Sequence, residues 1–248
     1  MLIIYIMSFS CLTRESIEKR NYNNLIDPRV KPEGDNLEII MKPDYWARAK
    51  KELSKRDPVM KKLIAGYAGE GLARRGDNAF ETLARAITGQ QISVKAADTI
   101  WNRLVTKYNP LLPESLLHAD DTELRALGFS RQKVGYIKDI ADKFFYKLIA
   151  VSHHETGDKD DAEIMRELMS IKGVGRWTAE MFMIFHLLKP DIFPIGDLGL
   201  QKTIQNLYFK SKKTPPARME KVAEKWRPWR TVATWYLWRS LDPYPISY

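Results

Sequence analysis

Apolar residues recur at intervals of three and four along most of this chain, which is the spacing of amphipathic helices. No segment shows the sustained alternation of apolar and polar residues that marks a strand. The pattern therefore predicts an all-α fold, with two helical lobes and a cleft between them. The expected helical segments outside residues 164–196 are 43–66, which restarts after Asp57 and Pro58, and 78–88, 93–108, 113–127, 134–148, 197–209, 219–226 and 231–241.

The most informative stretch runs from residue 164 to residue 204 and begins with two helices around a tight turn. An apolar helix is expected to end near Met169, and a second helix to run from Arg176 to Leu188. Gly173 and Gly175 in the turn allow positive φ and a close approach by another molecule. The free amides of the second helix, together with its dipole, attract phosphate. The alternative is an αα-hairpin whose glycines only permit the turn.

A single acid follows this hairpin at the start of a third helix. The connector from Pro190 to Gly196 leads to Asp197, which lies 20 residues after Trp177. An aspartate in this place is usually an N-cap, and a helix N-terminus also favours its ionised form. A hairpin that grips phosphate, followed by a placed carboxylate, suits chemistry beside a nucleic-acid backbone.

Composition narrows the class of partner and excludes several cofactors. The 248 residues include 40 Lys and Arg against 31 Asp and Glu, a net charge of +9 that favours a phosphate-rich partner. The single cysteine, Cys11, excludes an intramolecular disulfide and a four-cysteine iron–sulfur cluster. The four histidines, of which only His153 and His154 are adjacent, have no metal-ligand spacing.

Residues 1–41 differ from the rest of the chain. The opening MLIIYIM is apolar but far shorter than the roughly 20 residues that span a bilayer, and it lacks the features of a secretory signal. The polar residues that follow are typical of a disordered or loosely packed extension. We therefore expect one folded domain over residues 42–248, made of two helical subdomains, in a cytoplasmic protein that would be nucleoid-associated if bacterial.

Three motifs in order give this chain a family resemblance. LMSIKGVGRWTAEMF followed by DIFPIGDLGL resembles the helix-hairpin-helix and Gly/Pro…Asp superfamily of DNA glycosylases, and is most similar to the DNA-3-methyladenine glycosylase II type. The other motifs are AITGQQISVKAA from Ala86 to Ala97 and KWRPWRTVATWYLWRSLDP from Lys225 to Pro243. The similarity covers residues 42 to 241.

The resemblance implies a monofunctional enzyme of base excision repair. Such an enzyme flips an alkylated purine, 3-methyladenine or 7-methylguanine, out of double-stranded DNA. It then hydrolyses the N-glycosidic bond, and Asp197 would stabilise the positive charge that develops on the sugar. Bifunctional relatives carry a lysine where this chain has Trp177, so no strand cleavage is expected. No cofactor, no membrane and a monomeric state are also expected.

The resemblance assigns further roles by position. Trp177, Met181 and Trp238 would form the base pocket, where a tryptophan face attracts a cationic alkylated purine. Gln90 and Gln91 would enter the gap left by the flipped nucleotide. Contacts to the DNA backbone are expected from Lys172, Gly173, Val174, Gly175, Arg176, Arg131 and Lys133. A sodium or potassium ion would be held by the backbone carbonyls of Met169, Ile171 and Val174.

Two other functions fit parts of the sequence. A helix-hairpin-helix protein that binds DNA without catalysis would share the hairpin, but it would have no need of the acid at Asp197. An RNA-binding helical module would share the basic charge and would bind structured RNA more tightly than duplex DNA.

Overall fold

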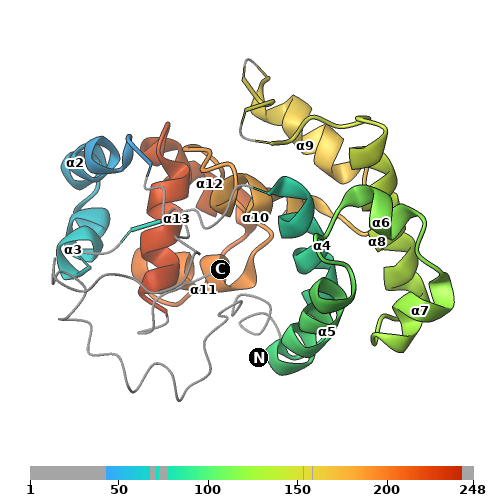
Figure 1. The fold of residues 1–248 in the computed structure, drawn as a ribbon. Coiled ribbons are helices and arrows are strands. Elements are labelled where there is room, and N and C mark those ends of the chain that lie inside the picture. Colours follow the sequence, from blue (N-terminus) through green and yellow to red (C-terminus); the bar gives the residue numbers. More distant parts are fainter. Residues whose placement is uncertain (1–42, 68–70, 73–77, 153, 158, 242–248) are drawn as a thin grey trace, which may run out of the picture.

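We describe a computed structural model, in which residues 43–67, 71–72, 78–152, 154–157 and 159–241 are placed. The predicted extension, residues 1–41, lies outside these described residues. Within them the secondary structure is helical (Figure 1), which confirms the all-α prediction. None of the helices in these ranges combines the length and apolar character needed to cross a membrane. The helices are α2 Trp46–Arg56, α3 Pro58–Gly66, α4 Ala79–Gly89, α5 Val94–Lys107, α6 Pro113–Leu117, α7 Asp121–Ala126, α8 Arg131–Phe145, α9 Asp161–Met169, α10 Arg176–Phe185, α11 Leu198–Tyr208, α12 Pro216–Ala223, the 3-10 turn η3 Glu224–Trp226, and α13 Arg230–Arg239.

Local capping explains where the helix boundaries differ from the prediction. The segment 113–127 is two short helices because Asp120 caps α7, where its side chain accepts from the amide of Thr122. Helix α8 begins at Arg131, three residues early, because the Ser130 hydroxyl accepts from the amide of Lys133. Helix α10 ends at Phe185 rather than Leu188, since Leu188 has a φ of 54° and cannot continue the helix.

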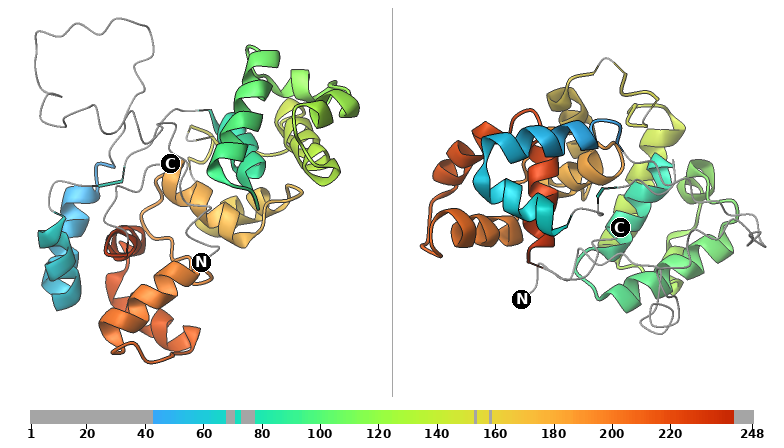
Figure 2. Two further views of the ribbon diagram at one scale, coloured as in Figure 1. Left: turned by 90° about the horizontal axis from the view of Figure 1, so that it is seen from below. Right: turned by 90° about the vertical axis from the view of Figure 1, so that its left-hand side faces the viewer.

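The helices form two lobes joined by a hairpin (Figures 1 and 2). The first lobe is continuous in sequence, α4 to α8, with α8 packed against α4, α6 and α7. The second lobe combines both ends of the described chain, because α2 and α3 pack against α13, and α11 packs against both α13 and α12. The α9–α10 hairpin contacts the first lobe through α4.

Helix α13 is the centre of the second lobe. Every residue from Thr231 to Arg239 is buried, because α2, α3 and α11 surround the helix. A helix that is buried on all sides needs no polar stripe, which explains the tryptophan-rich sequence of this segment. Its packing against α11 also brings Trp238 beside the first residues of that helix.

Candidate active site and nucleic-acid interface

The turn between α9 and α10 depends on Gly173. This glycine has a φ of 84°, and a Cβ there would lie 2.3 Å from Cδ2 of Tyr136 on α8. Gly175 differs from the prediction, since its φ is −85° and an added Cβ would meet nothing within 4 Å. Of the two glycines, Gly173 therefore has the left-handed backbone conformation, and its lack of a side chain also lets the turn lie against α8.

The N-terminus of α10 keeps its first amides available for a ligand. Gly175 is its N-cap and supplies no capping side chain, so the first-turn amides lack the partner that such a cap gives. Gly175 and Arg176 are exposed. An exposed helix N-terminus with an adjacent guanidinium suits phosphate. Lys172 also lies at this surface, where its amide donates to Asp139 at 2.9 Å and its Nζ lies 3.4 Å from the same carboxylate.

Asp197 is held by hydrogen bonds from three elements. It caps α11, where its Oδ1 accepts from the amide of Leu200 at 2.7 Å. Trp238 of α13 donates its indole N–H to the same oxygen at 3.0 Å, and Trp177 of α10 donates to Oδ2 at 3.1 Å. The residue is 1% exposed. All three partners are N–H donors, so they suit a charged carboxylate and fix its plane.

The two carboxylate oxygens of Asp197 differ in how many further hydrogen bonds they can accept. A carboxylate oxygen accepts about two hydrogen bonds. Oδ1 of Asp197 already accepts two, from Leu200 and Trp238, whereas Oδ2 accepts one, from Trp177, among the described residues. Oδ2 is therefore the oxygen with capacity to face a cationic sugar or to orient a water molecule.

The three residues predicted for the base pocket differ in how accessible they are. Trp238 is 3% exposed and stacks on Phe185, with ring centroids 5.9 Å apart and an angle of 15°. Its ring is thus engaged within the protein, and its observed role is to hold Asp197. Trp177 and Met181 are half-buried on α10 and are more accessible to a base. Trp177 and Trp238 thus both donate to Asp197, and the base pocket itself stays a prediction.

Sequence reasoning missed Glu180, a second carboxylate in this region. It is 3% exposed on α10, and its Oε1 lies 3.0 Å from Nε of the exposed Arg176. Burial raises the pKa of Glu180, the Arg176 guanidinium opposes this shift, and the charge of Asp197 adds to it. The only signal in the sequence is its position four residues after Arg176 and three after Trp177, on the same helical face.

The loop predicted to enter DNA joins α4 to α5. Gln91 is exposed and has a φ of 58°, in the left-handed region that residues other than glycine rarely adopt. The Gln90 side chain points elsewhere, since its Nε2 donates to the carbonyl of Gly173 at 3.0 Å. Of the two glutamines, Gln91 is the one that projects, while Gln90 joins this loop to the hairpin.

The structure corrects the role predicted for Lys133. Its Nζ donates to the carbonyls of Thr88 at 2.7 Å and Gln90 at 2.6 Å, so it points into the protein. Burial lowers the pKa of Lys133. Arg131, two residues earlier, is exposed at the start of α8 and keeps its predicted place for phosphate contact.

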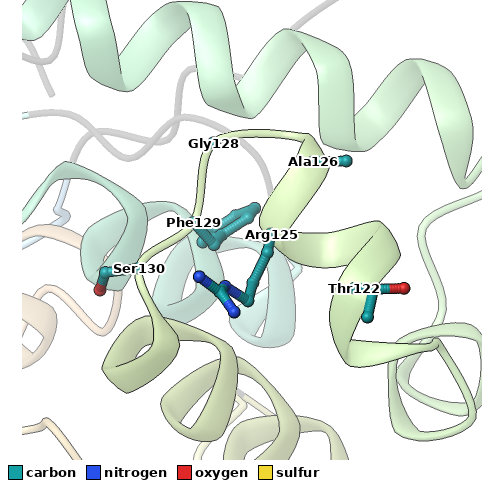
Figure 3. A pocket seen from close by; sticks show the side chains of 6 residues that line it. All are labelled: Thr122, Arg125, Ala126, Gly128, Phe129 and Ser130. Carbon is teal, nitrogen blue, oxygen red and sulfur yellow. The ribbon is translucent and has the colours of Figure 1, made fainter.

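Two other features bear on possible ligand sites. A surface pocket lies at the α7–α8 turn (Figure 3), lined by Thr122, Arg125, Ala126, Gly128, Phe129 and Ser130. Because these residues belong to the first lobe and Asp197 to the second, this pocket is separate from the carboxylate. Within the described ranges, no three His, Cys, Asp or Glu side chains cluster to hold a metal.

The alkali cation assigned to the hairpin carbonyls stays a prediction. Backbone carbonyls are hard donors that suit such an ion. The carbonyl of Ile171 already accepts from the amide of Val174 at 3.1 Å, which uses one of its two lone pairs. The carbonyl donor set fits the ion, and the site chemistry around Asp197 does not depend on it.

Comparisons with known proteins agree with this arrangement. Residues 84–228 match the HhH-GPD superfamily of base excision DNA repair proteins. In Schizosaccharomyces pombe, the alkylbase DNA glycosidase-like protein mag2 is 32% identical over 81% of this chain and 96% of its own length. DNA-3-methyladenine glycosylase 1 of the same yeast is 34% identical, over 72% of this chain and 79% of its own. The solved structure of S. pombe Mag1 with abasic DNA superposes with a TM-score of 0.64 at 32% identity, covering 80% of this chain and 99% of that one.

Proposed function

Because this chain belongs to the HhH-GPD superfamily of base excision DNA repair proteins, we propose that it is a monofunctional DNA glycosylase that excises alkylated purines. Its substrates are 3-methyladenine and 7-methylguanine in double-stranded DNA. It acts as a monomer, without a cofactor, in the cytoplasm or on the nucleoid if bacterial. The described relatives named as 3-methyladenine glycosylases, and the Mag1 complex with abasic DNA, support this assignment.

The observation that carries the proposal is the buried carboxylate beside the hairpin. A base must be flipped out of the helix before it can be removed. The α10 N-terminus binds the backbone, and Trp177, one residue into the same helix, donates to Asp197. One rigid helix, α10, thus carries both the backbone grip and an indole donor that holds the acid. As the base leaves, Oδ2 stabilises the cationic sugar and orients the attacking water.

The choice of substrate depends on which aromatic side chains at the site are accessible to a flipped base. An N-alkylated purine carries positive charge, and an indole face attracts a cation by about 0.5–2 kcal/mol. Trp177 is the half-buried indole at the site, whereas Trp238 is buried against Phe185. We therefore place Trp177, with Met181 one turn further along α10, next to the flipped base.

The first prediction concerns the products of the reaction. Alkylated duplex DNA is expected to lose free 3-methyladenine and 7-methylguanine, measured by mass spectrometry, and to keep an unbroken strand at the abasic site. Strand cleavage by this superfamily needs a lysine that forms a Schiff base with the sugar, and Trp177 occupies that position. Borohydride should therefore trap no protein–DNA adduct. An adduct on a lysine would contradict the monofunctional assignment, and binding without base release would favour a DNA-binding protein that lacks catalysis.

The second prediction concerns Arg176. Each phosphate contact by a cation releases condensed counterion, so log K falls with log salt by about 0.9 per phosphate on duplex DNA. Arg176→Ala should therefore make the slope shallower by about one and weaken binding to all sequences alike. Fluorescence anisotropy over a series of salt concentrations measures both. Lys172→Ala is the comparison, because both side chains are exposed and each lies beside a carboxylate, Arg176 at 3.0 Å from Glu180 and Lys172 at 3.4 Å from Asp139. An unchanged salt slope for Arg176→Ala would mean that Arg176 does not contact the DNA backbone.

A further inference from the structure

We propose that Lys133 is a positioning residue that sets the α4–α5 loop, and with it Gln91, in register with the α9–α10 hairpin. This proposal rests on the proposed function, because it assigns a cause to the placement of the side chain that enters DNA. It gives Lys133 a role inside the protein in place of a contact with phosphate.

The first observation is where the ammonium group lies. Lys133 Nζ donates to the carbonyls of Thr88, at 2.7 Å, and Gln90, at 2.6 Å. Thr88 is in the last turn of α4 and Gln90 is its C-cap. The last carbonyls of a helix have no hydrogen-bond donor within the helix, and they lie at the negative end of its dipole. An ammonium group there supplies the missing donor and also neutralises the dipole charge. Lys133 thereby fixes the place where α4 stops and the loop begins.

The second observation is the backbone conformation that follows. Directly after Gln90, Gln91 has a φ of 58°, in the left-handed region that is unfavourable for an L-residue with a Cβ. A strained residue persists where its surroundings hold it in place. The lysine fixes the carbonyl of Gln90, just before Gln91, and the Ser93 side chain caps α5 just after it. The loop is therefore held on both sides of its projecting residue.

The third observation links this loop to the hairpin through α8. Lys133 holds the loop, Tyr136 lies under Gly173, and Asp139 accepts from the amide of Lys172 at 2.9 Å. These anchors are three and six residues apart, so they lie on successive turns of one helix. The Gln90 side chain closes the arrangement by donating to the carbonyl of Gly173 at 3.0 Å. One rigid helix thus sets the spacing between the inserted side chain and the backbone grip.

A spacing of this kind matters for the rate. Flipping requires the loop to fill the gap while the hairpin holds the phosphates, and a misplacement of about 1 Å can cost about a hundredfold. A methionine at position 133 keeps the length of the stem but has neither charge nor donor. Losing the lysine would leave two helix-end carbonyls to water and release Gln91 from its constraint.

The experiment compares Lys133→Met with Lys133→Arg and with Gln91→Ala. We expect Lys133→Met to slow single-turnover excision of 7-methylguanine about ten- to hundredfold. It should also lose the fluorescence change of a 2-aminopurine placed opposite an abasic-site analogue, while affinity for undamaged duplex and its salt slope stay as in the wild type. Lys133→Arg, which keeps charge and donors, should recover most of the rate. The double variant Lys133→Met/Gln91→Ala should be little slower than either single variant, because both act through one side chain.

Two results would overturn the proposal. If Lys133 contacts phosphate, Lys133→Met makes the salt slope shallower by about 0.9 and leaves the 2-aminopurine signal unchanged. If the residue only supports the fold, excision and binding fall together with the melting temperature, and the effects of Lys133→Met and Gln91→Ala multiply. The proposed function is tested separately by base release from the wild type. If that fails, the fluorescence and salt measurements still report on the loop.

Discussion

Replacing Asp197 by asparagine should lower the rate of base release by about 10²- to 10⁴-fold, the range typical of removing one electrostatic or acid–base group. Asparagine keeps the N-cap of α11, because its side-chain oxygen still accepts from the amide of Leu200. It removes the negative charge that faces the sugar and places an amide N–H₂ opposite the indole N–H of Trp177. Single-turnover excision on alkylated duplex measures the loss, and affinity for the same DNA should be retained or improved.

The second lobe contains a matched control for this variant. Asp57 is also 1% exposed, also caps a helix, α3, and also accepts from an indole, Trp226 Nε1 at 2.9 Å. Tyr208 donates to it as well, and Lys225 lies 3.1 Å away. Asp57→Asn should therefore lower the melting temperature while the folded enzyme keeps its excision rate. If Asp197→Asn excised the base as fast as the wild type, Asp197 would have no catalytic role. If Asp197→Asn and Asp57→Asn lost rate equally, Asp197 would be only a structural helix cap.

Gly173→Ala should be the most disruptive single change in the hairpin. The left-handed φ of 84° costs alanine about 1–2 kcal/mol. The new Cβ would also lie 2.3 Å from Cδ2 of the Tyr136 ring, and overpacking of this kind costs about 1–3 kcal/mol. Together these predict a loss of roughly 2–5 kcal/mol in the free energy of unfolding. Urea unfolding measures it, and duplex affinity should fall as well because the turn moves off α8.

Gly175→Ala is the comparison for this prediction. Its φ is −85° and its added Cβ meets nothing within 4 Å, so stability should change by less than about 0.5 kcal/mol. Because Gly175 is the exposed N-cap of α10, a methyl group there would still crowd a phosphate approaching the amides. Weaker DNA binding with unchanged stability is the expected result. Equal destabilisation by the two substitutions would contradict the distinction drawn between the glycines.

Much of the fold could be predicted from the sequence because its causes are local. The helices follow from apolar spacing, and the break between α2 and α3 follows from Asp57 and Pro58. The Asp197 cap and the amides at the start of α10 involve residues within one turn of each other. The errors, such as the start of α8 and the end of α10, also have local causes, in a serine cap and a left-handed leucine that apolar spacing does not register.

What only the tertiary structure decided are the partners of the polar side chains across large separations in sequence. Trp238 lies 41 residues from Asp197, and Lys133 lies 43 from Gln90. Which polar group meets which depends on how the helices pack, since packing sets the few ångströms that separate a hydrogen bond from none. The sequence by itself determined that a hairpin, a glutamine loop and an acid are present. Packing made Trp238 a donor to Asp197, and it made Lys133 an internal anchor in place of the expected phosphate contact.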